Sequence, residues 1–214
     1  MHATQLRPGG LKLTKEGADC AHISADSRVL DVGCGTGTTL RFLHDTYGCS
    51  VFGIDCSAKS VLLAKSGVPE AGVVCGDAAS LPFPDQSFDI VFMECTLTLF
   101  QNPQEALLEA GRVLVKDGFL IIETLKRKDA RAFLDDGAVS LPLLTSFLTE
   151  HGFRIVLSED KTDDLVQFST DIIFQYDSPE AYLRSCTEET GGSIFSCDMN
   201  RKGLGYHLLV MQRQ

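Results

Sequence analysis

The chain has 214 residues, which suits one domain with a small insertion and is long enough to bury a sizeable core. Its 29 acidic and 19 basic residues give a net charge of -10. Such a surface repels polyphosphates and anionic membrane faces, so we expect neither nucleic acid nor a membrane as a partner.

The N-terminus shows no apolar run typical of a start-transfer signal, and no window approaches the ~18 apolar residues of a spanning helix. We therefore expect a cytoplasmic protein. The eight cysteines are scattered and include no C-x-x-C pair. Reduced thiols explain them more simply than a disulfide scaffold, and we expect no metal site.

The first organised stretch is R-V-L-D-V-G-C-G-T-G, residues 28 to 37. A short apolar run ends near Asp31 and passes into three glycines at alternate positions, which predicts a buried strand, a tight turn and then a helix. Glycines allow positive φ and close approach of a ligand, while the helix start offers free N–H donors. The pattern indicates a turn that holds a nucleotide-like ligand.

The motif D-x-G-x-G-x-G differs from the G-x-G-x-x-G of dinucleotide folds, and it resembles that of the class I S-adenosylmethionine-dependent methyltransferases of the small-molecule type. The resemblance implies that the acid serves the amino-acid end of S-adenosylmethionine. The cofactor residues expected at this turn are Asp31, Gly33, Cys34, Gly35 and Gly37.

The resemblance also implies that residues 1–27 cap the cofactor site and contribute to substrate choice, with Arg7 and Thr14 as candidates. Pro8-Gly9-Gly10 predicts irregular structure before a short helix near residues 15–20. The alternative is an arm that merely covers the sheet edge.

Two further strands end in acids. Residues 50–55 end at Asp55, about 20 residues past the glycine turn, where a carboxylate can accept both hydroxyls of a ribose. Cys56 follows it in the expected cofactor site, and Ser57 is the better cap for the next helix, which would free Asp55. The third strand lies within residues 71–78, and the resemblance places Asp77 at the adenine edge with the Ala78 amide at a ring nitrogen.

The run L-P-F-P-D-Q-S-F-D at residues 81–89 is a loop typical of the same family before a fourth strand, residues 90–94. Methyltransferases of nucleobase or glutamine amino groups carry an N/D-P-P-Y/F motif at this strand's end. Glu94 and Cys95 stand there instead, which disfavours such substrates. Glu94 is a weak candidate for a general base; it could also order the loop or touch the methionine end of the cofactor.

The remaining pattern predicts helices from residue 103, at 141–151 and at 162–176, and strands at 119–123, 153–157 and 206–211. Roughly 45 residues separate the last two strands, far more than the usual connection of about 4 to 6, which indicates an inserted cap. Possible substrate contacts in it, each of which alone is better explained as cap core, are Tyr176, Tyr182, Cys186, Phe195 and Cys197.

We therefore predict an α/β, Rossmann-like open sheet of about seven mostly parallel strands with an antiparallel edge strand, helices on both faces and a small cap. The expected segments are an arm at 1–27, a cofactor-binding core at 28–157, a cap at 158–204 and a final edge strand at 205–214.

The predicted function is transfer of a methyl group from S-adenosylmethionine to a small-molecule acceptor by in-line substitution. No motif identifies the acceptor or the oligomeric state. One alternative is a soft, thiophilic acceptor such as arsenite, held by Cys20, Cys186 and Cys197. The other is a protein that binds S-adenosylmethionine without catalysis.

Overall fold

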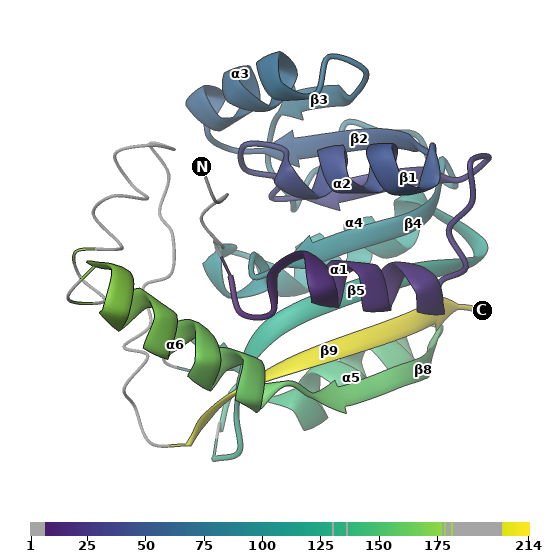
Figure 1. Cartoon of the computed structure of the whole chain (residues 1–214). Coiled ribbons are helices and arrows are strands. Elements are labelled where there is room, and N and C mark those ends of the chain that lie inside the picture. The colour runs from purple at the N-terminus through teal and green to yellow at the C-terminus, as the bar shows by residue number, and fades with distance from the viewer. Residues whose placement is uncertain (1–6, 130, 136, 177, 179–180, 182–202) are drawn as a thin grey trace.

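One mixed sheet runs through the part of the chain that the computed structural model describes, residues 7–129, 131–135, 137–176, 178, 181 and 203–214 (Figure 1). The strands of this sheet are β1 Arg28–Val32, β2 Ser50–Asp55, β3 Gly72–Cys75, β4 Phe88–Glu94, β5 Leu114–Arg127, β6 Leu134–Asp135, β7 Ala138–Val139, β8 Phe153–Asp160 and β9 Leu204–Arg213. β6 and β7 are two-residue strands that extend the sheet beyond β5.

The strand order explains where a ligand cleft can form. β3, β2, β1, β4 and β5 lie side by side in that order, and all four pairings are parallel. The strands β1, β2 and β3 thus follow one another toward one edge of the sheet, whereas β4 and β5 follow on the other side of β1. The strand order therefore reverses between β1 and β4. A crevice at the carboxyl ends of the two central strands is the usual ligand site of such an open sheet, as predicted.

Helices cover both faces of the sheet (Figure 1). They are α1 Gly10–Cys20, α2 Thr38–Tyr47, α3 Ala58–Gly67, α4 Pro103–Val113, α5 Leu141–Glu150 and α6 Thr162–Tyr176, with a 3-10 turn, η1, at Leu97–Leu99. Side chains of α1, α2 and α3 pack in one cluster with Val29 of β1. Side chains of α4 and α5 pack in another cluster with the next residue, Leu30. Successive strand residues point to opposite faces, so the continuous apolar strands need a helical layer on each side.

The last strand is not at the edge of the sheet, where we expected it. β9 pairs antiparallel with β5 along one side and with β8 along the other. Its residues are buried almost continuously, while most of β8 is exposed or half-buried. A strand that is apolar on both faces is stabilised by an interior position, which leaves β8 next to solvent. β8 also runs to Asp160, so the expected boundary at residue 158 falls inside a strand.

The segment expected to be a cap is described only in part. Its helix, α6, has the predicted extent and packs Leu165 against Tyr206 of β9 and Leu13 of α1. The side chain of Tyr176 and the whole of Tyr182, Cys186, Phe195 and Cys197 lie outside the described residues.

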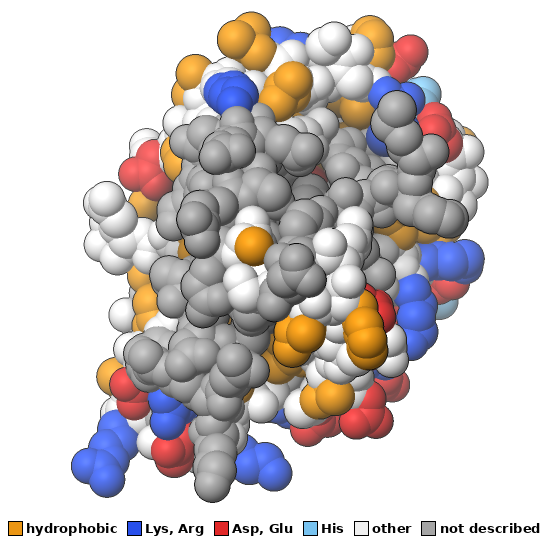
Figure 2. Space-filling model, turned by 60° about the vertical axis from the view of Figure 1, so that its left-hand side comes forward, with side chains coloured by type: hydrophobic (Ala, Val, Ile, Leu, Met, Phe, Trp, Pro, Cys, Tyr) orange, Lys and Arg blue, Asp and Glu red, His pale blue; other side chains and the backbone are white. Residues whose placement is uncertain are grey.

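Some large apolar side chains are exposed to solvent. Examples are Leu62 and Leu63 of α3, a helix that lies at the top of the view in Figure 2.

None of the helices among the described residues is both long and apolar enough to cross a membrane.

Candidate active site

The glycine turn after β1 has the backbone geometry that the motif predicts. Gly33, Gly35 and Gly37 have φ values of 82°, 53° and 85°. The Gly33 amide donates to the carbonyl of Ile54 at 2.7 Å, and a Cβ at Gly33 would lie 2.3 Å from Thr96 Cγ2. A Cβ at Gly35, by contrast, would meet nothing within 4 Å. The turn is therefore packed closely on β2 and the end of β4, and it is open where Gly35 faces the cleft.

A cleft of about 540 Å³ lies at the carboxyl ends of β1, β2, β3 and β4, within the size range of small-molecule sites. It brings together nearly all the residues predicted to hold the cofactor, namely Asp31, Gly33, Cys34, Gly35, Asp55, Cys56, Asp77, Ala78 and Glu94. Gly37 does not line it. This glycine is instead the N-cap of α2, where a Cβ would lie 3.2 Å from Ala64 of α3.

Asp55 is held by two backbone amides at the mouth of the cleft. Its Oδ2 accepts from the Gly35 N–H at 2.9 Å, and its Oδ1 accepts from the Ser57 N–H at 2.8 Å. Ser57 caps α3 by accepting from the Ser60 N–H, as predicted. The cap does not free Asp55 as we expected, because the same serine donates to it. Each carboxylate oxygen still has a second lone pair that a ligand hydroxyl can use.

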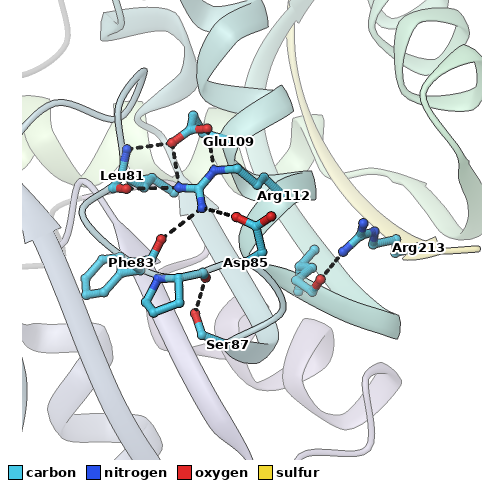
Figure 3. A network of polar contacts seen from close by, with 9 residues as sticks. Leu81, Phe83, Asp85, Ser87, Glu109, Arg112 and Arg213 are labelled. Atoms are coloured by element: carbon cyan, nitrogen blue, oxygen red, sulfur yellow. Dashed lines mark hydrogen bonds and ion pairs between the residues drawn. The ribbon is translucent and has the colours of Figure 1, made fainter.

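Asp77 lies at the far end of the cleft, after β3. Its Oδ1 accepts from the Ala79 N–H at 2.9 Å, and its side chain is exposed. The loop that follows is held by Arg112 of α4 (Figure 3). This guanidinium donates to the carbonyls of Leu81 and Phe83, at 2.9 Å each, and pairs with Glu109. The family-like loop is thereby tied to the core.

The N-terminal arm enters the cleft through a buried ion pair. Arg7, three residues before the start of α1, lines the cleft and contacts Glu94 Oε2 at 2.6 Å through Nη2. Glu94 also accepts from Thr14 of α1 at 2.7 Å and from Thr39 of α2 at 2.6 Å. α1 begins at Gly10, earlier than predicted, which places Thr14 one turn into the helix. The two arm residues singled out from sequence thus both meet Glu94.

A second acid, missed in the sequence, lies behind this pair. Glu123 of β5 is in register with Glu94 and fully buried, with Oε2 3.4 Å from Arg7 Nε and 3.2 Å from the donating Tyr206 hydroxyl. Burial and the neighbouring Glu94 raise the pKa of Glu123. Cys95 lies 2.7 Å from the same hydroxyl through Sγ, in a left-handed conformation with φ of 57°. An acid at the end of an apolar strand beside β4 was the available signal.

Asp31 completes a group of acids with little compensating charge. It is 3% exposed, and burial together with Glu94 raises the pKa of its carboxyl. Among the described residues that line the cleft, Asp31, Asp55, Asp77 and Glu94 are acids, whereas Arg7 is the one Lys or Arg. Such a cleft favours a ligand with positive charge near its buried end.

The described residues contain no cluster of three or more His, Cys, Asp or Glu side chains that could hold a metal ion. Of the cysteines proposed to hold a soft acceptor, Cys20 is outside the residues that line the cleft, and Cys186 and Cys197 are outside the described residues.

A run of parallel strands with a glycine turn after the first and acids at or near the ends of the first three is characteristic of enzymes that bind a nucleoside-containing cofactor. Comparison with known proteins specifies the class. A model of the family described as "Methyltransferase domain" matches residues 30–122. An uncharacterised protein of Haemophilus influenzae is 31% identical over 78% of this chain and 70% of its own length. The chain belongs to this methyltransferase family.

Solved structures share the fold. A phosphoethanolamine N-methyltransferase of Haemonchus contortus in complex with S-adenosyl-L-methionine has a TM-score of 0.76 at 17% identity, covering 99% of this chain and 54% of that one. The [4+2]-cyclase SpnF has a TM-score of 0.75 at 24% identity, covering 94% of this chain and 80% of that one. The chain thus spans about half of the first of these proteins and most of the second.

The matched domain is that of a methyltransferase, and S-adenosyl-L-methionine is the ligand in the solved complex with the same fold. Its cleft fits this cofactor on two observations. Gly35 leaves open space beside the backbone, and the acids lack enough cationic partners among the described residues to balance them. S-adenosylmethionine carries a sulfonium and an ammonium against one carboxylate, so it supplies the missing positive charge.

Proposed function

We propose that this protein moves the methyl group of S-adenosylmethionine to a small-molecule acceptor by in-line substitution, using the cleft at the ends of β1 to β4. The observation that carries the proposal is the convergence of Asp31, Asp55 and Asp77 on one cleft. In this arrangement Asp31 meets the amino-acid end, Asp55 accepts from the ribose hydroxyls, and Asp77 accepts from the exocyclic amine of adenine, with the Ala78 amide at a ring nitrogen.

The acceptor has its own side of the cleft. The segment after β4 contributes Leu99, Phe100 and Gln101 to the lining, a few residues beyond Cys95 in the chain. We assign the acceptor to this side, because the end of β4 meets the methionine end of the cleft at Glu94. An apolar wall with one amide suits a small organic molecule and helps to exclude water.

Catalysis in this scheme is mainly alignment. The bound cofactor supplies a methyl carbon that its sulfonium already makes electrophilic. The chain holds acceptor and methyl group in line, and such alignment can contribute about 7 to 11 kcal/mol. Glu94 is poorly suited to act as a general base, because Arg7, Thr14 and Thr39 all donate to its carboxylate. We assign it a positioning role that docks the arm onto the cleft.

Isothermal titration calorimetry with S-adenosylmethionine tests the cofactor assignment. Asp55→Ala removes a charged acceptor whose hydrogen bonds contribute about 1.5 to 3 kcal/mol each, so we expect the Kd to rise at least tenfold. Asp26→Ala, at an exposed acid outside the cleft, is the matched control. Unchanged affinity in Asp55→Ala, or no saturable heat in the wild type, would overturn the assignment.

Methyl transfer itself is tested with S-adenosylmethionine labelled in the methyl group and a metabolite panel that contains phosphorylated and unphosphorylated amines, alcohols, thiols and arsenite. Label in a small product supports the proposal. Cofactor binding without transfer to any member of the panel favours the alternative of a non-catalytic binding protein. The cyclase of the same fold shows why this second assay is needed, since fold alone does not define the reaction.

A further inference from the structure

Thiols are unusually frequent in the cofactor cleft. Cys34, Cys56, Cys75 and Cys95 all line it. Cys34 is 7% exposed, and Cys95 contacts the Tyr206 hydroxyl, so both are occupied in the buried part of the site. Cys56 and Cys75 are exposed and free of disulfides. The two accessible thiols of the cleft are therefore these two.

The sheet brings Cys56 and Cys75 next to each other. Asp55 of β2 and Cys75 of β3 are paired positions in neighbouring parallel strands, and Cys56 is the next residue along the chain. Cys75 Sγ lies 3.6 Å from the Cys56 carbonyl oxygen, to which it donates. Neighbouring strands run about 4.8 Å apart with a rise of about 3.3 Å per residue, so this diagonal pair has its Cα atoms roughly 6 Å apart. Disulfides join Cα atoms about 4.4 to 6.8 Å apart, so the backbone spacing permits a disulfide between the two strand ends.

The pair also lies where it can control the cofactor. Cys56 stands between Asp55, assigned to the ribose, and Ser57, which caps α3 and donates to Asp55. Cys75 precedes the Gly76-Asp77 turn assigned to adenine, and the Gly76 amide donates to the Asp55 carbonyl at 3.1 Å. A bond between the two sulfurs would draw these strand ends together and occupy the space that the adenosyl group needs.

We propose that Cys56 and Cys75 form a redox-sensitive modification site, which a small-molecule disulfide converts into an intramolecular disulfide that excludes S-adenosylmethionine. This inference rests on the proposed use of the cleft for the cofactor. One cysteine thiolate attacks a sulfur of the disulfide R–S–S–R and expels one R–S⁻. The second cysteine thiolate then attacks the mixed disulfide and expels the other R–S⁻.

The exchange balances in atoms and electrons. One S–S bond breaks and one forms, the two cysteines lose two electrons and two protons, and the reagent takes up both as two R–SH molecules. Partial burial and the Asp55 carboxylate raise the pKa of Cys56, so the exchange should be carried out at mildly alkaline pH.

The experiment treats the full-length protein with oxidised glutathione and then measures S-adenosylmethionine binding by calorimetry and disulfide linkage by peptide mass spectrometry. We expect a peptide linked through Cys56 and Cys75, binding weakened more than tenfold and recovery after dithiothreitol. Saturating S-adenosylmethionine should slow the formation of this disulfide. Cys56→Ser and Cys75→Ser should each lack this linkage, whereas Cys49→Ser, at a buried thiol outside the cleft, should form it as the wild type does.

The outcomes separate the two proposals. If reduced protein does not bind S-adenosylmethionine, the cofactor assignment itself fails. If reduced protein binds but the linked form binds equally well, or if only single glutathione adducts form at these residues, the thiol-pair proposal is wrong.

Discussion

The stability of this fold should depend on pH through His207 of β9. His207 is 5% exposed, and Lys126 of β5 donates to its Nδ1 at 3.1 Å. Since the ammonium is only a donor, Nε2 carries the ring proton and donates to Ser158 Oγ at 2.8 Å. A second ring proton would sit on Nδ1 and point at the positively charged ammonium of Lys126. Burial and this ammonium lower the pKa of His207 to about 4, while the nearby Asp160 and Glu159 oppose the shift.

The sign follows from proton linkage. In the unfolded chain the imidazole has its ordinary pKa of about 6.5, so the unfolded state binds the proton first as the pH falls. The contribution of a neutral His207 is present above this value and is lost as the pH falls through the folded pKa. Between pH 7 and pH 5 the loss is about 2 kcal/mol. Hydrogen bonds from Lys126 and Thr162 lower the pKa of Asp160, so its contribution is lost only at more acid pH.

Urea unfolding of the wild type and of His207→Gln at pH 7 and pH 5 measures the pH-dependent contribution of His207 to the free energy of unfolding. Glutamine can keep a hydrogen bond to Ser158 but cannot titrate. Other groups, including Asp31 and Glu123 with their raised pKa values, contribute equally to both proteins and cancel. We expect the wild type to lose about 2 kcal/mol more than the variant. Parallel losses in the two proteins would refute the reasoning.

Two further predictions concern the cleft. Arg7→Met should lower the free energy of unfolding by about 3 kcal/mol, because it leaves the buried Glu94 without its cation. In denaturant titrations, the double variant with Glu94→Gln should recover at least half of that loss. Gly33→Ala should be more destabilising than Gly152→Ala by about 1 to 3 kcal/mol. Both glycines have positive φ, but only a Cβ at Gly33 would collide with Thr96. Equal shifts of the melting temperature in the two variants would contradict this prediction.

Much of the fold could be read from local patterns. The apolar runs ending in Asp31 and Asp55, and the helix at residues 162–176, occur where the pattern predicted, because periodicity and turn residues act over a few positions. The three positive φ values of the glycine turn were predictable for the same reason. The convergence of Asp31, Asp55 and Asp77 also followed, since successive parallel strands end at the same edge of a sheet.

The placement of β9 required the tertiary structure. Chain order suggested an edge, whereas β9 inserts between β5 and β8, where the helices on both sides of the sheet cover its two apolar faces. The position of Gly37 shows the same limit, since the third glycine of the motif packs on α3 rather than lining the cleft.

The polar cluster was the least predictable part. Sequence alone singled out Arg7, Thr14 and Glu94 without relating them. It did not relate Tyr206 or Glu123, the acid that ends an apolar strand, to these residues. These side chains come from the arm and from strands far apart in the chain. Local sequence determined the cofactor-binding turn and the acids at the strand ends, because those are short-range features. Only packing of distant strands decided which charges meet, because burial and distance, and not residue type, decide whether a carboxylate is paired or protonated.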